Sequence, residues 1–292
     1  MNYFITQTIN GLSLGSIYAL IALGYTMVYG IVQLINFAHG DIIMVGAYVS
    51  FFTIPTLQSM GLPLWLCIIP ALIICTLLGV VIERLAYRPL RESPRIANLI
   101  TAIGVSLLLQ NLAMKFIGTE SKQIGVIFSK QETAIGISPN TIIIIVTTII
   151  LTLLLQAFMK RTRTGKSLVA VSEDYVASKL CGINVDHAIS ITFAIGSALA
   201  AVAALFYIST YQQINPTMGS LPGIKAFIAA VLGGIGSIPG AVIGGLILGI
   251  CEIFTRAYIS SQLADAVVFG ILIIVLIFKP AGLFGKNVKE KV

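Results

Sequence analysis

Charged residues are scarce in this sequence of 292 residues. Asp, Glu, Lys and Arg together make up 10% of it, whereas they make up about 25% of an ordinary soluble domain. Hydrophobic residues account for 57% of the chain, which is more apolar surface than a water-soluble fold can hide. The composition therefore excludes an ordinary soluble domain.

Cysteine and histidine are sparse as well. The chain has four cysteines, with no CxxC pair, and two histidines. Three of the cysteines lie inside apolar runs and are interpreted as small buried hydrophobic residues, so neither a disulfide framework nor a metal site is indicated. The amino end lacks a basic segment before its apolar stretch, which predicts a retained first span rather than a cleaved signal peptide.

Long runs without any charge are the main positive feature. They cover residues 1–40, 42–82, 96–114, 133–159, 188–224 and 226–251. Because roughly 20 apolar residues cross a bilayer as a helix, they predict an all-α, polytopic integral membrane helix bundle of about eight or nine transmembrane helices, forming a single transmembrane domain over residues 1–292. Some segments are short or interrupted, which indicates broken or re-entrant helices. Spans are expected near 8–32, 41–56, 64–82, 96–117, 141–159, 188–210, 223–237, 240–258 and 262–279.

The basic residues, which give a net charge of +7, are clustered. Of the 18 Lys and Arg residues, four lie in 83–95, five in 160–187 and four from Lys279 to the end. Since such residues concentrate in cytoplasmic loops, these segments are predicted to lie inside, with the amino end outside. The excess charge then reflects topology, and no nucleic-acid partner is expected. On the outside, the alternation in "IGVIF" predicts a small hairpin within residues 118–140.

The stretch "VLGGIGSIPGAVIGGLILGICE" (231–252) imitates a dinucleotide-binding turn. Its glycines are spaced GxGxxxG, one residue too long, and further small residues four apart suit close helix packing in lipid instead. We interpret it as helix packing plus a helix break, in which the residues concerned are Gly234, Gly236, Pro239, Gly240 and Gly244. A second imitation, "KRTRTGKS" (160–167), has Lys160 where a phosphate loop needs glycine, so ATP binding is not expected here.

A short helix is predicted in the basic loop 160–187. Ser172 can cap it, acidic residues suit its first turn, and a glycine can close it near residue 182. Val176 and Leu180 lie four apart on one face and form an apolar ridge. The ridge is expected to dock against a soluble partner; resting on the bilayer or on the bundle is the alternative.

Polar residues inside apolar segments are the remaining candidates. Asn36, His39 and Asp41 lie between two spans, and a charge at membrane depth must sit at the interface or find a partner. Glu252 lies within an apolar helix and is by default a functional hypothesis, either facing a polar cavity or bracing a neighbouring helix. Gln110 and Asn111 are likewise candidates either for lining a polar pathway or for packing between helices.

Five motifs in order carry a family resemblance: "LINFAHGDIIMVGAY", "LITAIGVSLLLQN", "EDYVASKLCGI", "GIKAFIAAVLGGIGSIPGAVIGG" and "KPAGLFG". Together they resemble the LivH-type permease of branched-chain amino-acid ABC importers, from the first span to about Gly285. The resemblance implies a multi-pass protein of the bacterial cytoplasmic membrane. It implies as partners a second, LivM-like permease, two cytoplasmic ATPase subunits that hold ATP and Mg, and an extracytoplasmic substrate-binding protein.

The resemblance also gives the loop 160–187 a role as the coupling loop. Its predicted ATPase contacts are Glu173, Asp174, Val176, Leu180 and Gly182. The general importer motif has EAA, three residues and glycine, whereas here Glu173 precedes Gly182 by nine. The chain itself is expected to be no enzyme and to hold no cofactor. Two alternatives remain open: a permease for urea or short amides of the same family, and an ion-coupled carrier or channel motivated by Glu252.

Overall fold

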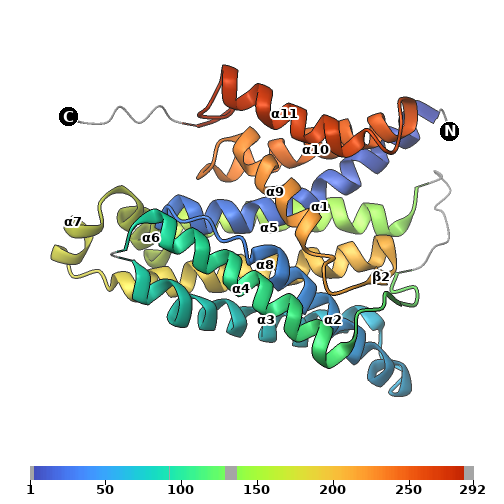
Figure 1. The fold of residues 1–292 in the computed structure, drawn as a ribbon, viewed down its shortest axis with the longest axis horizontal. Helices are drawn as coiled ribbons and strands as arrows, with labels where there is room; N and C mark the ends of the chain where they lie inside the picture. Colours follow the sequence, from blue (N-terminus) through green and yellow to red (C-terminus); the bar gives the residue numbers. More distant parts are fainter. Residues whose placement is uncertain (1–2, 92, 129–136, 286–292) are drawn as a thin grey trace.

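A computed structural model describes residues 3–91, 93–128 and 137–285. The chain is an all-α, polytopic membrane protein (Figure 1). Its helices are α1 (Tyr3–Val32), α2 (His39–Ser59), η1 (Leu64–Cys67), α3 (Ile68–Ile82), the π-helix η2 (Glu83–Tyr87), η3 (Arg88–Leu90), α4 (Arg95–Ile117), α5 (Pro139–Arg161), α6 (Arg163–Glu173), α7 (Tyr175–Leu180), α8 (Val185–Tyr211), α9 (Ser220–Gly233), α10 (Ile238–Tyr258) and α11 (Ala264–Phe278). The strands are β1 (Lys122–Gln123) and β2 (Gln213–Ile214).

Every span expected from the sequence coincides with an apolar helix. Within the described residues, seven are long and apolar enough to cross a membrane, and α9 and α11 are shorter. At 1.5 Å per residue, the 14 residues of α9 extend about 21 Å, less than the ~30 Å of a hydrocarbon core. With 14 and 15 residues, α9 and α11 are therefore both too short to cross the hydrocarbon core as straight helices.

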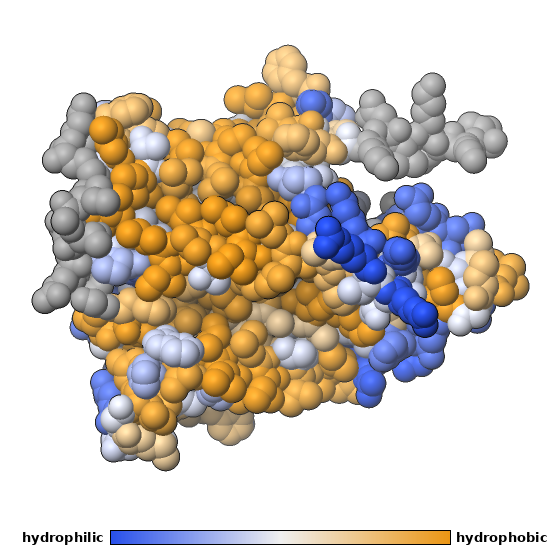
Figure 2. Space-filling model, turned by 180° about the vertical axis from the view of Figure 1, so that it is seen from behind, coloured by the Kyte–Doolittle hydropathy of each residue, from blue (hydrophilic) through white to orange (hydrophobic). Residues whose placement is uncertain are grey.

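The helix α1 occupies the middle of the bundle. It packs against α10, α8, α9 and α5, and 83% of its most apolar window is buried. In contrast, only 17% of the most apolar window is buried in each of α4 and α5. Figure 2 shows hydrophobic residues over the broad middle of one face and hydrophilic residues gathered at the end that carries α6 and α7. This arrangement is the one that lipid demands, since exposed apolar side chains meet acyl chains and the polar ends meet water.

The described parts of the three basic segments lie at one end of the bundle, which we call the basic end. The connection from α3 to α4, the helices α6 and α7, and residues 279–285 after α11 all lie toward the left of Figure 1, whereas α1 begins at the right. This agrees with the topology expected from the charge distribution, in which the basic end is cytoplasmic.

The outer connection differs from its expected structure. The prediction of a hairpin within residues 118–140 is wrong for the described part, because β1 pairs antiparallel with β2, 90 residues later in the chain, and "IGVIF" is not a strand. Residues 129–136 lie outside the described residues. The pairing ties the connection after α4 to the approach of α9.

Candidate functional site

Two helices begin inside the bundle and their starts touch. Gly24 of α1 lies against His39, the first residue of α2. Gly24 precedes the end of α1 by eight residues, or about 12 Å along the helix axis, so the His39 ring lies well inside the bundle. The backbone of Gly40 also contacts that of Gly219, just before α9, so closely that a Cβ on either would overlap the other's carbonyl. Both helices are therefore preceded by non-helical chain, residues 33–38 and 215–219, that leads into the bundle interior.

Asp41 lies at this junction, in the first turn of α2. Its side chain is buried, with the residue 2% exposed. Gln110 of α4 donates from Nε2 to Asp41 Oδ1 at 2.8 Å, and the same amide nitrogen lies 3.2 Å from the hydroxyls of Ser106 and Ser220. The site thus joins α2, α4 and α9 through neutral donors around one carboxylate.

Among the described residues, no cation lies beside the Asp41 carboxylate. Three carboxylates are buried in the described chain, and ion pairs form at the other two: Glu83 with Arg91, and Glu252 with Lys225. An acid at the bilayer centre costs about 2.5–3.5 kcal/mol on insertion scales, whereas a helix N-terminus returns about 0.3–1 kcal/mol, up to ~2. The first turn of α2 therefore offsets only part of the cost of this carboxylate.

The other residues expected near this break have separate surroundings. Tyr87 donates to Asn36 Oδ1 at 3.0 Å. The ring of His39 packs edge-on to Tyr25 at 4.7 Å between centroids, and its buried Nε2 has no hydrogen-bond partner in the described part of the chain. Asn111 lies on the exposed side of α4 and donates to Leu107 O at 2.7 Å. Of the polar candidates, the structure brings Asp41 and Gln110 into contact and leaves Asn111 apart.

Glu252 sits in a second buried polar group, on α10. Lys225 Nζ donates to Glu252 Oε1 at 2.7 Å, and the hydroxyl of Tyr18 donates to Oε2 at 2.8 Å. Arg256 also donates to Oε1, and Lys225 reaches Asp265 at 2.6 Å. The carboxylate therefore braces α1, α9 and α10, and Lys225 extends the group to α11.

A third polar group lies at the basic end. The buried Glu83 accepts from Arg91 and, at 2.7 Å, from the hydroxyl of Ser190 on α8. Asp186, in the first turn of α8, pairs with Arg88 and Arg91 at 2.5 Å each. This network fixes the chain after α3 to the start of α8, immediately after the loop that carries α7.

A pocket of about 670 Å³ opens beside this network. Its lining includes residues 31–34, which lead into α2, and residues 171–173 and Tyr175 of the loop. Arg88, Arg91 and Asp186 of the network also line it. The loop and the approach to Asp41 thus border the same space.

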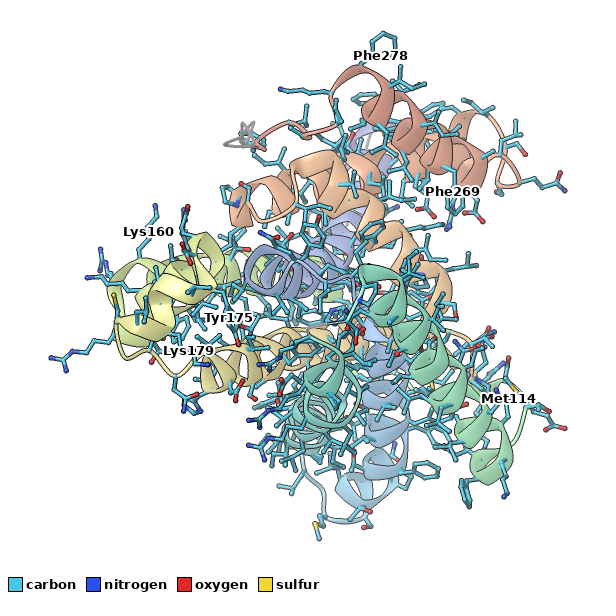
Figure 3. All side chains as sticks on the ribbon, turned by 60° about the vertical axis from the view of Figure 1, so that its left-hand side comes forward. Met114, Lys160, Tyr175, Lys179, Phe269 and Phe278 are labelled. Carbon is cyan, nitrogen blue, oxygen red and sulfur yellow. The ribbon has the colours of Figure 1, made fainter. Side chains whose placement is uncertain are left out.

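The helix α7 presents its apolar ridge to the outside. Val176 is 65% exposed and Leu180 is 85% exposed. Figure 3 shows that Tyr175 and Lys179 lie on the projecting lobe that also carries Lys160. Because no part of the described chain covers the ridge, it is free to contact another molecule.

The predicted boundaries of this helix require correction. Ser172 does not cap it; its hydroxyl donates to Val169 O at 2.7 Å, within α6. The cap is Asp174, whose Oδ1 accepts from the backbone nitrogens of Val176 and Ala177, while Glu173 ends α6. Because α6 is capped at Thr162 and runs to Glu173, Ser172 lies within α6 and cannot cap α7. Gly182, with φ of +80°, follows the end of α7 as the glycine was expected to.

Neither sequence that imitates a nucleotide site forms one. The chain breaks between α9 and α10, where Gly234 and Gly236 have φ of +100° and +92° and Ser237 caps α10. Pro239 lies in the first turn of α10, and Gly240 and Gly244 pack on the backbone of α9. In "KRTRTGKS", the glycine is inside the first turn of α6 and packs on the end of α5, with no strand before it.

Comparison with known proteins identifies the family. The family model described as "Branched-chain amino acid transport system / permease component" matches residues 7–276. The chain belongs to this family. Curated relatives of this permease include LivH of Salmonella typhimurium, LivH of Escherichia coli and BraD of Pseudomonas aeruginosa, each a high-affinity branched-chain amino acid transport system permease protein, and each 46% identical over 99% of this chain and 98% of its own. Among solved structures, PsaBC from Streptococcus pneumoniae in complex with Fab has a TM-score of 0.48 at 13% identity, covering 97% of this chain and 94% of its own, which is too weak to establish a shared fold.

Several polar residues of this permease were missed by sequence reasoning. Lys225 is the one charge between residues 188 and 251, and that isolation in an apolar stretch was a usable signal for a partner of Glu252. Tyr18, Ser220 and Asp265 carried no comparable signal, because their importance depends on contacts between distant helices.

Proposed function

We propose that this chain is the membrane-spanning permease subunit of an ATP-driven importer that carries leucine, isoleucine and valine across the cytoplasmic membrane of a bacterial cell. The single observation that carries the proposal is the identity of 46% over nearly the full length of relatives named as branched-chain amino acid permeases. The multi-pass helical fold and the polar junction at membrane depth agree with it.

The energy source belongs to partners in this proposal. Two ATPase subunits bind ATP and Mg at the basic end, a second permease completes the membrane part, and a binding protein delivers substrate from outside. Transport then proceeds by alternating access, in which ATP binding and hydrolysis bias the bundle between outward-open and inward-open states.

The geometry provides a route by which conformational change in the ATPase subunits reaches the helix bundle. The exposed ridge of α7 is the ATPase contact, with Glu173, Asp174 and Gly182 around it. Movement of α7 changes the pocket that it shares with residues 31–34, and those residues lead directly into the start of α2. Coupling thereby passes from the basic end to the Asp41 junction.

Copurification and reconstitution test this function. The tagged chain, extracted gently from its native membrane, is expected to bring down two ATPases and a second permease, and the complex is expected to move labelled leucine into liposomes only with ATP and the binding protein. Competition by urea would favour the urea or amide alternative. Transport by the chain alone, without ATP, would establish a self-sufficient carrier and contradict the proposal.

The ridge gives a sharper test of coupling. Changing Val176→Ala together with Leu180→Ala removes the exposed apolar contact without touching the bundle core. We expect leucine uptake to fall to background, because ATPase docking is lost, while the chain stays in the membrane at its normal level. Phe116→Ala, which removes a side chain that is 76% exposed at the end of α4 remote from α7, is the control. Normal uptake by the double variant would refute docking through the ridge.

A further inference from the structure

Asp41 differs from the other two buried acids in the groups that surround its carboxylate, and the difference points to a ligand. Each of the other acids has its counter-charge built into the fold: Glu83 has Arg91, and Glu252 has Lys225 and Arg256. Asp41 is equally buried but, in the part of the chain that the structure describes, it has only neutral donors. A carboxylate held in that way is complementary to a cation that arrives from outside the chain.

The group that covers Asp41 is a neutral amide on a helix that makes few contacts with the rest of the bundle. Gln110 lies on α4, a helix that buries 17% of its most apolar window and packs mainly on α2 and η2. Its Nε2 bonds Asp41 at 2.8 Å and also lies 3.2 Å from two serine hydroxyls. An ammonium has three donors, so it can replace the amide on the carboxylate while the serine oxygens accept its other protons.

The surroundings also fit an amino acid with an apolar side chain. The rings of Tyr25, Phe37 and Phe227 form a contiguous group, with centroids 5.9 and 6.2 Å apart across Phe227. Phe37 precedes α2 and Phe227 lies two turns into α9, so the group borders the same two helix starts. Phe37 and Phe227 are partly exposed and thus offer apolar surface.

We propose that Asp41 binds the α-ammonium group of the amino acid in transit, which takes the place of the Gln110 amide on the carboxylate. The inference rests on the proposed function and names the residue that holds one end of its substrate. It makes Asp41 a residue that touches the substrate, with Gln110 as its exchangeable cover. Glu252, in contrast, is a structural brace.

The test uses the complete importer in proteoliposomes with its leucine-loaded binding protein. For Asp41→Asn, which keeps the size and a hydrogen-bond acceptor for Gln110, we expect at least a tenfold loss of leucine delivered per ATP hydrolysed, with assembly and ATP hydrolysis retained. Asp41→Glu, which keeps the charge, is expected to recover a substantial part of that ratio. Asn111→Ala, one residue beyond Gln110 on the exposed side of α4, is the matched control and is expected to behave as wild type.

Three outcomes would overturn the inference. An Asp41→Asn complex with the wild-type ratio would show that the charge is dispensable, and an Asp41→Glu complex no better than Asp41→Asn would show that charge is not what matters. If Asp41→Asn fails to assemble, Asp41→Glu and Asp41→Gln, which match in size and differ in charge, decide the point, and equal ratios overturn the inference. A wild-type complex that moves no leucine would instead contradict the proposed function.

Discussion

Glu252→Leu is expected to destabilise the permease by about 3 kcal/mol, because truncating one side of a buried ion pair leaves an uncompensated charge. The substitution removes the acceptor of Tyr18, Lys225 and Arg256 at once. Lys225, which is 4% exposed, would keep only the half-exposed Asp265. The free energy of unfolding in an SDS titration of the purified chain measures the loss.

A double-mutant cycle separates the pair from general damage. Lys225→Met alone should also be strongly destabilising, whereas Lys225→Met with Glu252→Leu should cost clearly less than the two single losses added together, since neither charge is then left behind. Arg88→Met, which breaks a pair with side chains 50% and 44% exposed, is the control and should cost about 0–1 kcal/mol. Strictly additive single losses would contradict a role for Glu252 as a brace.

The pairing of Glu252 bears on the carrier alternative. A carboxylate that exchanges ions or protons during transport must change partners, whereas Glu252 is held by two cations and a tyrosine hydroxyl. Because this network gives Glu252 a structural role, the burial of Glu252 no longer favours an ion-coupled carrier. Among the buried acids of the described residues, Asp41 is the one without a built-in counter-charge, and an amino acid brings a charge of the required sign.

The spans could be predicted because lipid leaves the chain few choices. Backbone groups at membrane depth must bond within their own segment, so apolar length alone locates the helices. The break between α9 and α10 could also be predicted from the sequence, since Gly234, Gly236 and Pro239 act through local backbone geometry. These features depend on neighbours in sequence.

The features that escaped prediction depend on distant partners. Asp41 and Gln110 are 69 residues apart, and β1 finds β2 rather than its own neighbour. The misplaced cap has a local cause: Ser172 and Asp174 are both good N-cap residues, and the choice between them was made by where α6 begins. Residue type located the candidates, but only packing shows which of them meet.

Gly249→Val is expected to destabilise the bundle by about 3 kcal/mol, at the upper end of what overpacking costs in a tight core. A Cβ on Gly249 would overlap the backbone of Gly15 on α1, and one turn earlier a Cβ on Gly245 would lie 2.6 Å from the nitrogen of Ala19. Small residues on α10 thus set the distance to α1. Since α1 also packs on α8, α9 and α5, the displacement cannot stay local.

Gly270→Val on α11 is the matched control. Its Cβ would meet nothing within 4 Å, and the change in intrinsic helix propensity is the same at both positions. The difference between the two variants in SDS unfolding therefore isolates the contact between α1 and α10. Equal unfolding free energies of the two variants would mean that α1 and α10 can move apart at no cost. The glycines of α10 would then serve some purpose other than close packing.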